Sequence, residues 1–467
     1  MWRDELQAWL IVRDSHSAGQ LLHALHYEGH PLLWYLILYI PAHVSWNPVW
    51  MQVINGLFAL GTAWLLLFAR RLPLAVRTLL AFSFFFFYQY GVVARSYALT
   101  TLLLMAAAHC VLGERPRHML AVLLLALAIN THVFAIPIAA ALLLWMFWGE
   151  KRDGCIGARE LLRNAKFWLS ALALAASTGA SYLVARPASD VAGLQGSNLS
   201  LGMRLLTAES MLLQMFVPYV PGRWISHLGM WFIPSFASCS LSIVLLAMAF
   251  LLLRTIGARL IFLGCTVMEI VEMAVTVRVP SVYHFGFIFT AFVISLQIDA
   301  AAPGKPQSCP GFPPRITTGL LYAFLGTQTL AMLCMSALDL VRPYSGAKEV
   351  ASWLERNHLD KNPLVLQSSD FTTAIVGYLE RPSAYYPSCR CFGSYEMRNN
   401  RRDPLRMATL NDFKKARGNS PLPVILIANN LMLPAKPQSL GLVEIHTTPP
   451  KELMWDEQFV IYEEKQP

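Results

Sequence analysis

Long apolar stretches follow one another through most of this chain, and they constrain its fold more than any other feature. About ten of them fall between residues 47 and 341, and several approach the roughly 20 residues that a helix needs to cross a bilayer. Charged residues make up only 14% of the 467 residues, whereas soluble domains carry about 25%. The sequence therefore predicts an α-helical polytopic membrane protein with about ten spans.

Polar breaks divide the apolar part into predicted spans. The longest run, 118–149, is divided at Asn130-Thr131-His132. Residues 1–46 are too polar to span, and the apolar stretch 32–42 is too short, so we expect it to lie in the membrane interface or to re-enter. The predicted spans are 47–69, 76–94, 97–112, 118–130, 132–149, 168–185, 229–253, 260–277, 283–299 and 316–341.

Positive charge is distributed unevenly between the two sets of loops. One set holds most of the basic residues, and Lys and Arg accumulate in cytoplasmic loops. Residues 1–46, the loop 186–228 and the C-terminal residues fall in the other set, so we expect them outside the cytoplasm. The basic set holds Arg70, Arg71, Arg77, Arg115, Arg117, Lys151, Arg152, Arg159, Arg163, Lys166, Arg254, Arg259, Lys305 and Arg315.

The net charge and the cysteines do not indicate nucleic-acid or metal binding. The basic loops account for the net charge of +9, and no basic and aromatic surface pattern accompanies it. Metal-binding cysteines usually occur as two pairs, and here Cys389 and Cys391 are a single C-x-C pair that could form a disulfide or stay as free thiols. No cofactor is predicted. A divalent metal is possible, but no motif indicates one.

The residues from about 345 onward change from apolar runs to alternating short elements. Residues 347–356 read as an amphipathic helix, and 363–367, 423–428 and 459–462 read as short strands. This alternation predicts a small α/β domain. The predicted domains are 1–46, an extracytoplasmic catalytic loop with interfacial helices; 47–341, a transmembrane helical domain; and 342–467, an extracytoplasmic α/β domain.

The N-terminal segment holds two groups that could carry chemistry. Asp4 and Glu5 are an acidic pair, and a carboxylate near a membrane surface can take a proton from an attacking hydroxyl. An isolated Asp-Glu pair is also common on solvated helix faces. Farther on, Gly29 and Pro31 predict a turn that places His30 at the start of a helix, where anions are favoured. An ordinary capping turn has the same residues.

Further candidates lie in the outer loops and in one span. Arg95 could hold a phosphate with a hydrogen bond from Tyr97, or it could anchor a hairpin in the interface. A later loop offers a second cationic group. Acids inside a span are rare and often functional, although pairing with an Arg or His of another span would also explain them. The second group comprises Arg278, Tyr283 and His284, and the possible cavity acids are Glu28, Glu269 and Glu272.

The order of these motifs resembles the GT-C superfamily of integral-membrane glycosyltransferases. The resemblance rests on Asp4-Glu5, then Glu28-Gly29-His30-Pro31, then many spans and a C-terminal extracytoplasmic domain, and it covers roughly residues 1–341. It is closest to bacterial relatives of the protein O-mannosyltransferases and of the lipid A aminoarabinose transferases. Such enzymes move a sugar from a polyprenyl-phosphate carrier to an acceptor hydroxyl in the outer leaflet.

The resemblance implies roles for the candidate residues. It makes Asp4 the general base towards the acceptor, gives Glu5 an orienting or assisting role, and makes His30 a contact to the carrier phosphate. Arg95, Tyr97 and the loop with Arg278, Tyr283 and His284 sit where the family gathers further phosphate contacts. Two features depart from the family: a transmembrane helix normally precedes the acidic motif, with which this sequence starts, and many relatives have two prolines where this chain has Pro31 alone.

The expected partners are a polyprenyl-phosphate-linked sugar donor, a lipid, glycan or protein acceptor, and membrane lipids, with no nucleic acid. The expected location is the inner membrane of a bacterium. A transporter or flippase of a lipid-linked sugar is the alternative, because Glu269 and Glu272 would suit proton coupling. Transporters often contain internal repeats, and this sequence has no convincing repeat. A non-catalytic relative that only binds the lipid carrier is a third possibility.

Overall fold

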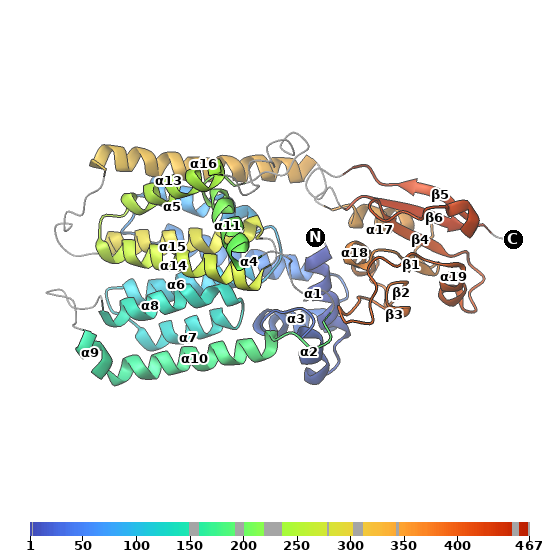
Figure 1. Ribbon diagram of the computed structural model, residues 1–467, viewed down its shortest axis with the longest axis horizontal. Helices are drawn as coiled ribbons and strands as arrows, with labels where there is room; N and C mark the ends of the chain where they lie inside the picture. The colour runs from blue at the N-terminus through green and yellow to red at the C-terminus, as the bar shows by residue number, and fades with distance from the viewer. Residues whose placement is uncertain are drawn as a thin grey trace.

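A bundle of helices and a small α/β domain make up the molecule, and three short N-terminal helices lie where the two meet (Figure 1). The architecture is that of a computed structural model. It describes residues 1, 3–148, 158–191, 200–218, 236–277, 280–301, 312–341, 345–450 and 457–465.

Each predicted span overlaps one or two helices of the bundle, although 229–235, the start of one predicted span, lies outside the described residues. In the part of the chain described, α4, α10, α15 and α16 are long and apolar enough to cross a membrane, and most of the others are shorter apolar helices. The chain thus has the apolar helices of a membrane protein, while a count of about ten spans stays a prediction. The bundle comprises α4 (Val49–Leu67), α5 (Leu74–Ala81), η1 (Phe84–Gln89), α6 (Tyr97–Leu112), α7 (His118–Ile129), η2 (Val133–Ala135), α8 (Ile136–Trp148), α9 (Ala158–Arg163), α10 (Ala165–Ala185), α11 (Leu201–Met211), α12 (Leu213–Phe216), α13 (Phe236–Leu252), α14 (Ile256–Thr276), α15 (Val282–Ala301) and α16 (Pro314–Val341).

The burial pattern of the bundle fits a lipid environment. Helix α15 is buried along most of its length and forms the centre of the bundle. The outer helices instead expose large apolar side chains, such as Leu60 and Trp64 on α4 and Leu172 on α10. Apolar surface on this scale is costly in water and favourable against lipid. The predicted break at 130–132 is confirmed, since α7 ends at Ile129 and η2 begins at Val133.

The N-terminal helices connect the bundle to the α/β domain. They are α1 (Arg3–Asp14), α2 (Ala18–Leu25) and α3 (Leu33–Val44), and Figure 1 shows α1 between the bundle and α18. Almost the whole of α1 is buried. The Glu5 carboxylate accepts a hydrogen bond of 2.7 Å from the backbone N–H of Ala94 in the bundle, and Leu6 packs against Gly377 of α18. The acidic pair therefore does not lie on a solvated helix face.

The turn before α3 differs from the prediction in one respect. Gly29 does adopt a positive φ of 71°, which only glycine adopts easily. Pro31, however, is not at the first helical position, because α3 begins at Leu33 with Leu32 as its N-cap. The backbone N–H of Leu33 is hydrogen-bonded to the carbonyl of Asn130 at 2.9 Å. This contact fixes the start of α3 against the end of α7, so that His30 lies in the loop rather than on the helix.

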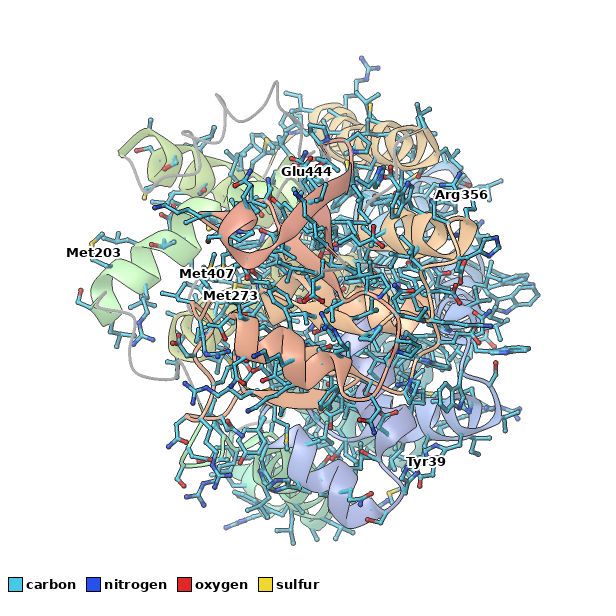
Figure 2. The ribbon with its side chains drawn as sticks, turned by 90° about the vertical axis from the view of Figure 1, so that its right-hand side faces the viewer. Tyr39, Met203, Met273, Arg356, Met407 and Glu444 are labelled. Atoms are coloured by element: carbon cyan, nitrogen blue, oxygen red, sulfur yellow. A yellow bond between two sulfur atoms is a disulfide. The ribbon has the colours of Figure 1, made fainter. Side chains whose placement is uncertain are left out.

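The α/β domain contains a mixed sheet of six strands in the order β3-β2-β1-β4-β6-β5. Strand β1 is parallel to β2 and β4, and the other pairings are antiparallel. In the view of Figure 2 this domain lies in front of the bundle, with Glu444 on β5 and Arg356 at the end of α17. The elements are α17 (Ala347–Arg356), β1 (Leu364–Leu366), α18 (Ser369–Tyr378), β2 (Ala384–Tyr386), β3 (Cys391–Gly393), α19 (Leu410–Arg417), β4 (Ile425–Asn429), η4 (Pro437–Leu440), β5 (Leu442–Thr447) and β6 (Phe459–Glu464).

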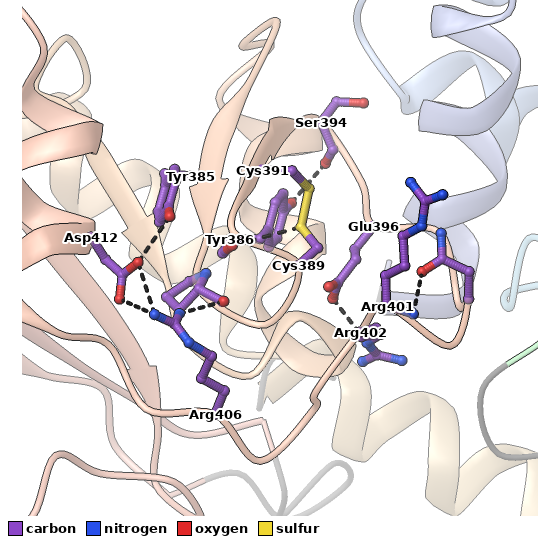
Figure 3. The surroundings of a disulfide bond; sticks show 12 residues. Tyr385, Tyr386, Cys389, Cys391, Ser394, Glu396, Arg401, Arg402, Arg406 and Asp412 are labelled. Atoms are coloured by element: carbon purple, nitrogen blue, oxygen red, sulfur yellow. Dashed lines mark hydrogen bonds and ion pairs between the residues drawn. A yellow bond between two sulfur atoms is a disulfide. The ribbon is translucent and has the colours of Figure 1, made fainter.

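The sequence-based elements of this domain are confirmed, and several others were missed. Helix α17 has the predicted bounds, β1 lies within its predicted segment, and β4 and β6 overlap theirs but extend one and two residues farther. The missed strands are short or, like β5, largely exposed, so they lack the apolar run on which the prediction relied. Cys389 and Cys391, the first residue of β3, form a disulfide (Figure 3), so the disulfide and not the pair of free thiols is the state found.

Gly286 on α15 allows the close approach of the hairpin that leads to Arg95. A Cβ atom at Gly286 would lie 2.1 Å from the hydroxyl oxygen of Tyr90, which donates a hydrogen bond of 2.7 Å to the carbonyl of Tyr283. We expect Gly286→Ala to destabilise the protein by about 1–3 kcal/mol through overpacking. Thermal denaturation in detergent measures this. Gly264→Ala on α14, where a Cβ meets nothing within 4 Å, is the control and should not destabilise. Equal denaturation midpoints for the two variants would contradict the prediction.

Candidate functional site

One cavity of about 710 Å³ gathers most of the predicted site residues. It lies where α1, the turn before α3, the ends of several bundle helices and the α/β domain meet. Segments far apart in the chain contribute to it. The predicted residues that line it are Asp4, Glu28, His30, Arg95, Tyr97, Glu272, Tyr283 and His284. Glu5 and Glu269 do not line it, and Arg278 lies outside the described residues.

Arg95 connects the acidic motif to the histidine turn. Its Nη1 atom lies 3.3 Å from Oδ2 of Asp4, and its Nη2 atom lies 3.1 Å from Nε2 of His30. The loop before Arg95 is held by Asn55 of α4, whose side-chain amide donates to the carbonyls of Tyr90 and Gly91 at 2.9 and 3.0 Å. The guanidinium of Arg95 is thus presented to the cavity from a fixed backbone.

His30 is a neutral side chain in this arrangement. A guanidinium only donates hydrogen bonds, so Nε2 of His30 is the acceptor and a neutral ring carries its proton on Nδ1. Burial lowers the pKa of His30 to about 3; the nearby charges of Arg95 and Arg398 act in the same direction, and Asp4 opposes them. The ring therefore offers the cavity a hydrogen-bond donor without a charge.

The low pKa of His30 predicts how stability changes with pH. Unfolded chains protonate histidine near pH 6.5, whereas the folded protein protonates His30 only near pH 3. Between these values the unfolded state binds the extra proton, so the free energy of unfolding falls by up to about 1.4 kcal/mol per pH unit on acidification. Asn does not bind a proton in this pH range, so the His30→Asn variant does not lose this part of the free energy of unfolding on acidification. We expect the denaturation midpoint of His30→Asn to improve relative to wild type from pH 7 to pH 5. A constant difference would contradict the prediction.

Aromatic rings form a wall of the cavity beside Arg95. The ring of Tyr97 stacks on that of Tyr283 with 5.3 Å between centroids, and the guanidinium carbon of Arg95 lies 5.3 Å from the Tyr97 centroid. The ring of His132 lies 5.1 Å from Tyr97. Nδ1 of His284 accepts a 2.9 Å hydrogen bond from the backbone N–H of Ser281, which leaves the proton of a neutral His284 on Nε2. The wall combines flat apolar surface with polar ring edges.

The three possible cavity acids have different surroundings. Glu28 accepts a hydrogen bond from the side-chain amide of Gln7, and burial raises the pKa of Glu28, which favours its neutral form. Glu272 lines the cavity from the last turn of α14. Glu269 is fully buried one turn earlier. In the described part of the chain neither Glu269 nor Glu272 forms an ion pair, so the alternative explanation, a pairing with an Arg or His of another span, is not found there.

Glu5 points away from the cavity that Asp4 lines. It is 2% exposed and lies beside a second hollow of about 540 Å³ between α4, α17 and α18. Neighbouring residues of a helix point about 100° apart, and these two acids line different hollows. Through its hydrogen bond to Ala94, Glu5 positions the residue next to Arg95. The geometry therefore fits the orienting role of Glu5 rather than a second base.

Some residues of the cavity were not identified from the sequence. His132 belongs to the polar break at 130–132, which was used only to divide two spans. Gln7 follows the acidic motif by less than one helical turn, so its position on α1 was a usable signal. Arg398 comes from the α/β domain and Arg186 from the end of α10. No local motif marks these two arginines, because only the packing of the domains brings them to the cavity.

No cluster of three or more His, Cys, Asp or Glu side chains suited to a metal ion occurs among the described residues. Comparisons with protein-family models, with curated proteins and with solved structures give no match for this chain. The chemistry of the cavity is therefore what indicates a function. That chemistry combines a partly exposed carboxylate, a guanidinium and neutral imidazoles beside an aromatic wall, a combination suited to deprotonating a hydroxyl next to an anionic group.

Proposed function

We propose that this protein is a membrane glycosyltransferase that moves a sugar from a polyprenyl-phosphate carrier to an acceptor hydroxyl. One observation carries the proposal: Asp4, His30 and Arg95, which the GT-C resemblance singles out, come from three separate segments and line the same cavity. Arg95 contacts both of the others directly. Such a group provides a base and a phosphate ligand side by side.

The proposed reaction is a single displacement at the sugar. The Asp4 carboxylate takes the proton of the acceptor hydroxyl while the oxygen of that hydroxyl bonds to the anomeric carbon. The bond between that carbon and the phosphate oxygen breaks, and the electron pair stays on the phosphate. The leaving polyprenyl phosphate gains a negative charge, which Arg95 stabilises and which the N–H of His30 can solvate. Attack from the side opposite the phosphate inverts the anomeric carbon.

The proposal places the cavity on the outer side of a bacterial inner membrane. Helix α9, which ends in the basic residue Arg163, lies at one end of the bundle, and α1, α3 and the α/β domain lie at the other (Figure 1). This separation supports the orientation that loop charges predict. The disulfide between Cys389 and Cys391 supports it independently, because disulfides persist in oxidising compartments such as the periplasm.

A transfer assay in proteoliposomes tests the proposal. Purified protein is reconstituted with a polyprenyl phosphate carrying a radiolabelled sugar, and an envelope extract supplies the acceptors. The proposal expects label to appear in an acceptor, with an equal amount of free polyprenyl phosphate. A panel of pentose, hexose and amino-pentose donors covers the unknown sugar. Label that stays on the carrier for every donor, in protein that is monodisperse and folded, would refute the proposal.

Glu269 favours a second candidate, a flippase for the lipid-linked sugar. Its carboxyl group is fully buried, and neither oxygen has a hydrogen-bond partner in the described part of the chain. It lies one turn from Glu272, which reaches the cavity. Buried acids of this kind serve as proton carriers in transporters. Movement of labelled carrier between leaflets without transfer, dependent on a proton gradient, would favour this function over the glycosyltransferase.

A further inference from the structure

The loop between β3 and α19 holds four arginines, and two of them have a structural role. Arg402 forms ion pairs of 2.9 Å with Glu396 and 2.6 Å with Asp370. Arg406 pairs with Asp412 of α19 at 2.8 Å, as Figure 3 shows. Arg402 and Arg406 are therefore paired with acids of the α/β domain itself. The arginines of this loop are Arg398, Arg401, Arg402 and Arg406.

Arg398 differs from its neighbours because it lines the cavity with Asp4. Its one ion pair among the described residues is a long contact of 3.8 Å from Nε to Asp370, a carboxylate that Arg402 already holds more closely. No hydrogen bond engages its guanidinium in the described part of the chain. The side chain is 37% exposed, so its remaining N–H donors are available to a ligand in the cavity.

The backbone around Arg398 is docked on the N-terminal helices and the bundle. Upstream, the Ser394 hydroxyl donates to the carboxylate of Asp14 at the end of α1. Downstream, Asn399 forms an antiparallel bridge with Val191, in the segment that follows α10. Contacts on both sides therefore hold the loop over the cavity. The position of Arg398 is a property of the packed fold and not of a free surface loop.

The charge balance of the proposed reaction calls for a second cation. The carrier phosphate has one negative charge while it is bonded to the sugar, and it gains another when that bond breaks. Arg95 carries one positive charge and is paired with Asp4 at 3.3 Å until that carboxylate takes the proton, so it cannot by itself balance both charges of the leaving phosphate. Arg398 acts electrostatically on Glu28 and His30, two groups on which Arg95 also acts. A planar guanidinium also matches two phosphate oxygens at once.

We propose that Arg398 is a second ligand of the carrier phosphate and that the α/β domain is therefore part of the donor site. The inference rests on the proposed function, because it assumes a phosphate-bearing carrier in the cavity. It gives the domain a direct role in donor binding. Without Arg398, the cations that line the cavity among the described residues would be Arg95, which is paired with Asp4, and Arg186 at the end of α10.

Direct binding of farnesyl phosphate tests this proposal without turnover. The full chain in detergent is titrated with farnesyl phosphate and with farnesol by calorimetry. We expect Arg398→Ala to weaken farnesyl phosphate binding about ten-fold or more, the value of a lost hydrogen-bonded charge, and to leave farnesol binding unchanged. Arg398→Gln keeps most of the length of the side chain but loses the charge, and it should also weaken farnesyl phosphate binding about ten-fold or more. It replaces Arg398→Ala in the test if that variant does not fold.

Arg401→Ala is the matched control, since Arg401 is an exposed arginine of the same loop that does not line the cavity. It should bind farnesyl phosphate within two-fold of wild type, about the error of the measurement. Wild-type affinity in both Arg398 variants would overturn the role of Arg398 and leave the proposed function intact. A wild-type protein that binds farnesyl phosphate no better than farnesol would instead refute the proposed function, and this inference with it.

Discussion

Replacing Asp4 by Asn is expected to lower kcat for sugar transfer about a thousand-fold, within the range of 10² to 10⁴ typical of a lost general base. The amide has nearly the shape of the carboxylate but cannot accept the proton of the acceptor hydroxyl. Asp4 lines the cavity and is not part of the bundle core, since its side chain is 25% exposed. The variant should therefore fold, and initial rates in the proteoliposome assay measure the effect.

The Michaelis constant for the donor separates this role from a structural one. The carboxylate of Asp4 forms an ion pair with Arg95, so removing this carboxylate leaves the guanidinium free to bind the carrier phosphate. We expect the KM for the donor to stay equal or to fall while kcat collapses. Glu114→Gln, which removes an exposed carboxylate between α6 and α7, should keep both constants. Wild-type kcat in Asp4→Asn would remove Asp4 as the base.

The apolar helices were predictable from the sequence because a local run of apolar residues is enough to indicate a membrane helix. Each predicted span overlaps a helix, and α7 ends where a polar break interrupts the apolar run. The convergence of Asp4, His30 and Arg95 was predictable for a related reason. Alternating spans carry every second loop to the same end of a bundle, so loop order alone brought these residues together.

The details of the cavity were not predictable, because they depend on how the elements pack. Nothing in the spacing of Asp4 and Glu5 indicates which of them faces the cavity; that follows from the rotation of α1 against Ala94 and α18. Arg398 was missed because its distance in sequence from Asp4 carries no periodic signal. The position of Pro31 was wrong by two residues because a contact between Leu33 and Asn130 sets the start of α3.

Arg95→Ala is expected to have the second large effect, a loss of about 10²–10³ in kcat/KM for the donor, as for other removed charge-stabilising groups. Unlike Asp4→Asn, it should also raise the KM for the donor, because it removes a phosphate ligand. Arg95→Lys keeps the charge but loses the fork that contacts Asp4 and His30 together. We expect it to retain an intermediate activity. An unchanged kcat/KM in Arg95→Ala would exclude the phosphate role.

The double variant Asp4→Asn/Arg95→Ala distinguishes two ways in which Arg95 could act. If Arg95 only holds Asp4 in place through the 3.3 Å contact, its removal has nothing further to disturb once Asp4 is Asn, and the double variant should match Asp4→Asn. If Arg95 also binds the carrier phosphate, the double variant should bind farnesyl phosphate more weakly than Asp4→Asn, by about ten-fold or more. We expect the second result, because Asp4 occupies only one of the two Nη atoms and the other lies beside a neutral histidine.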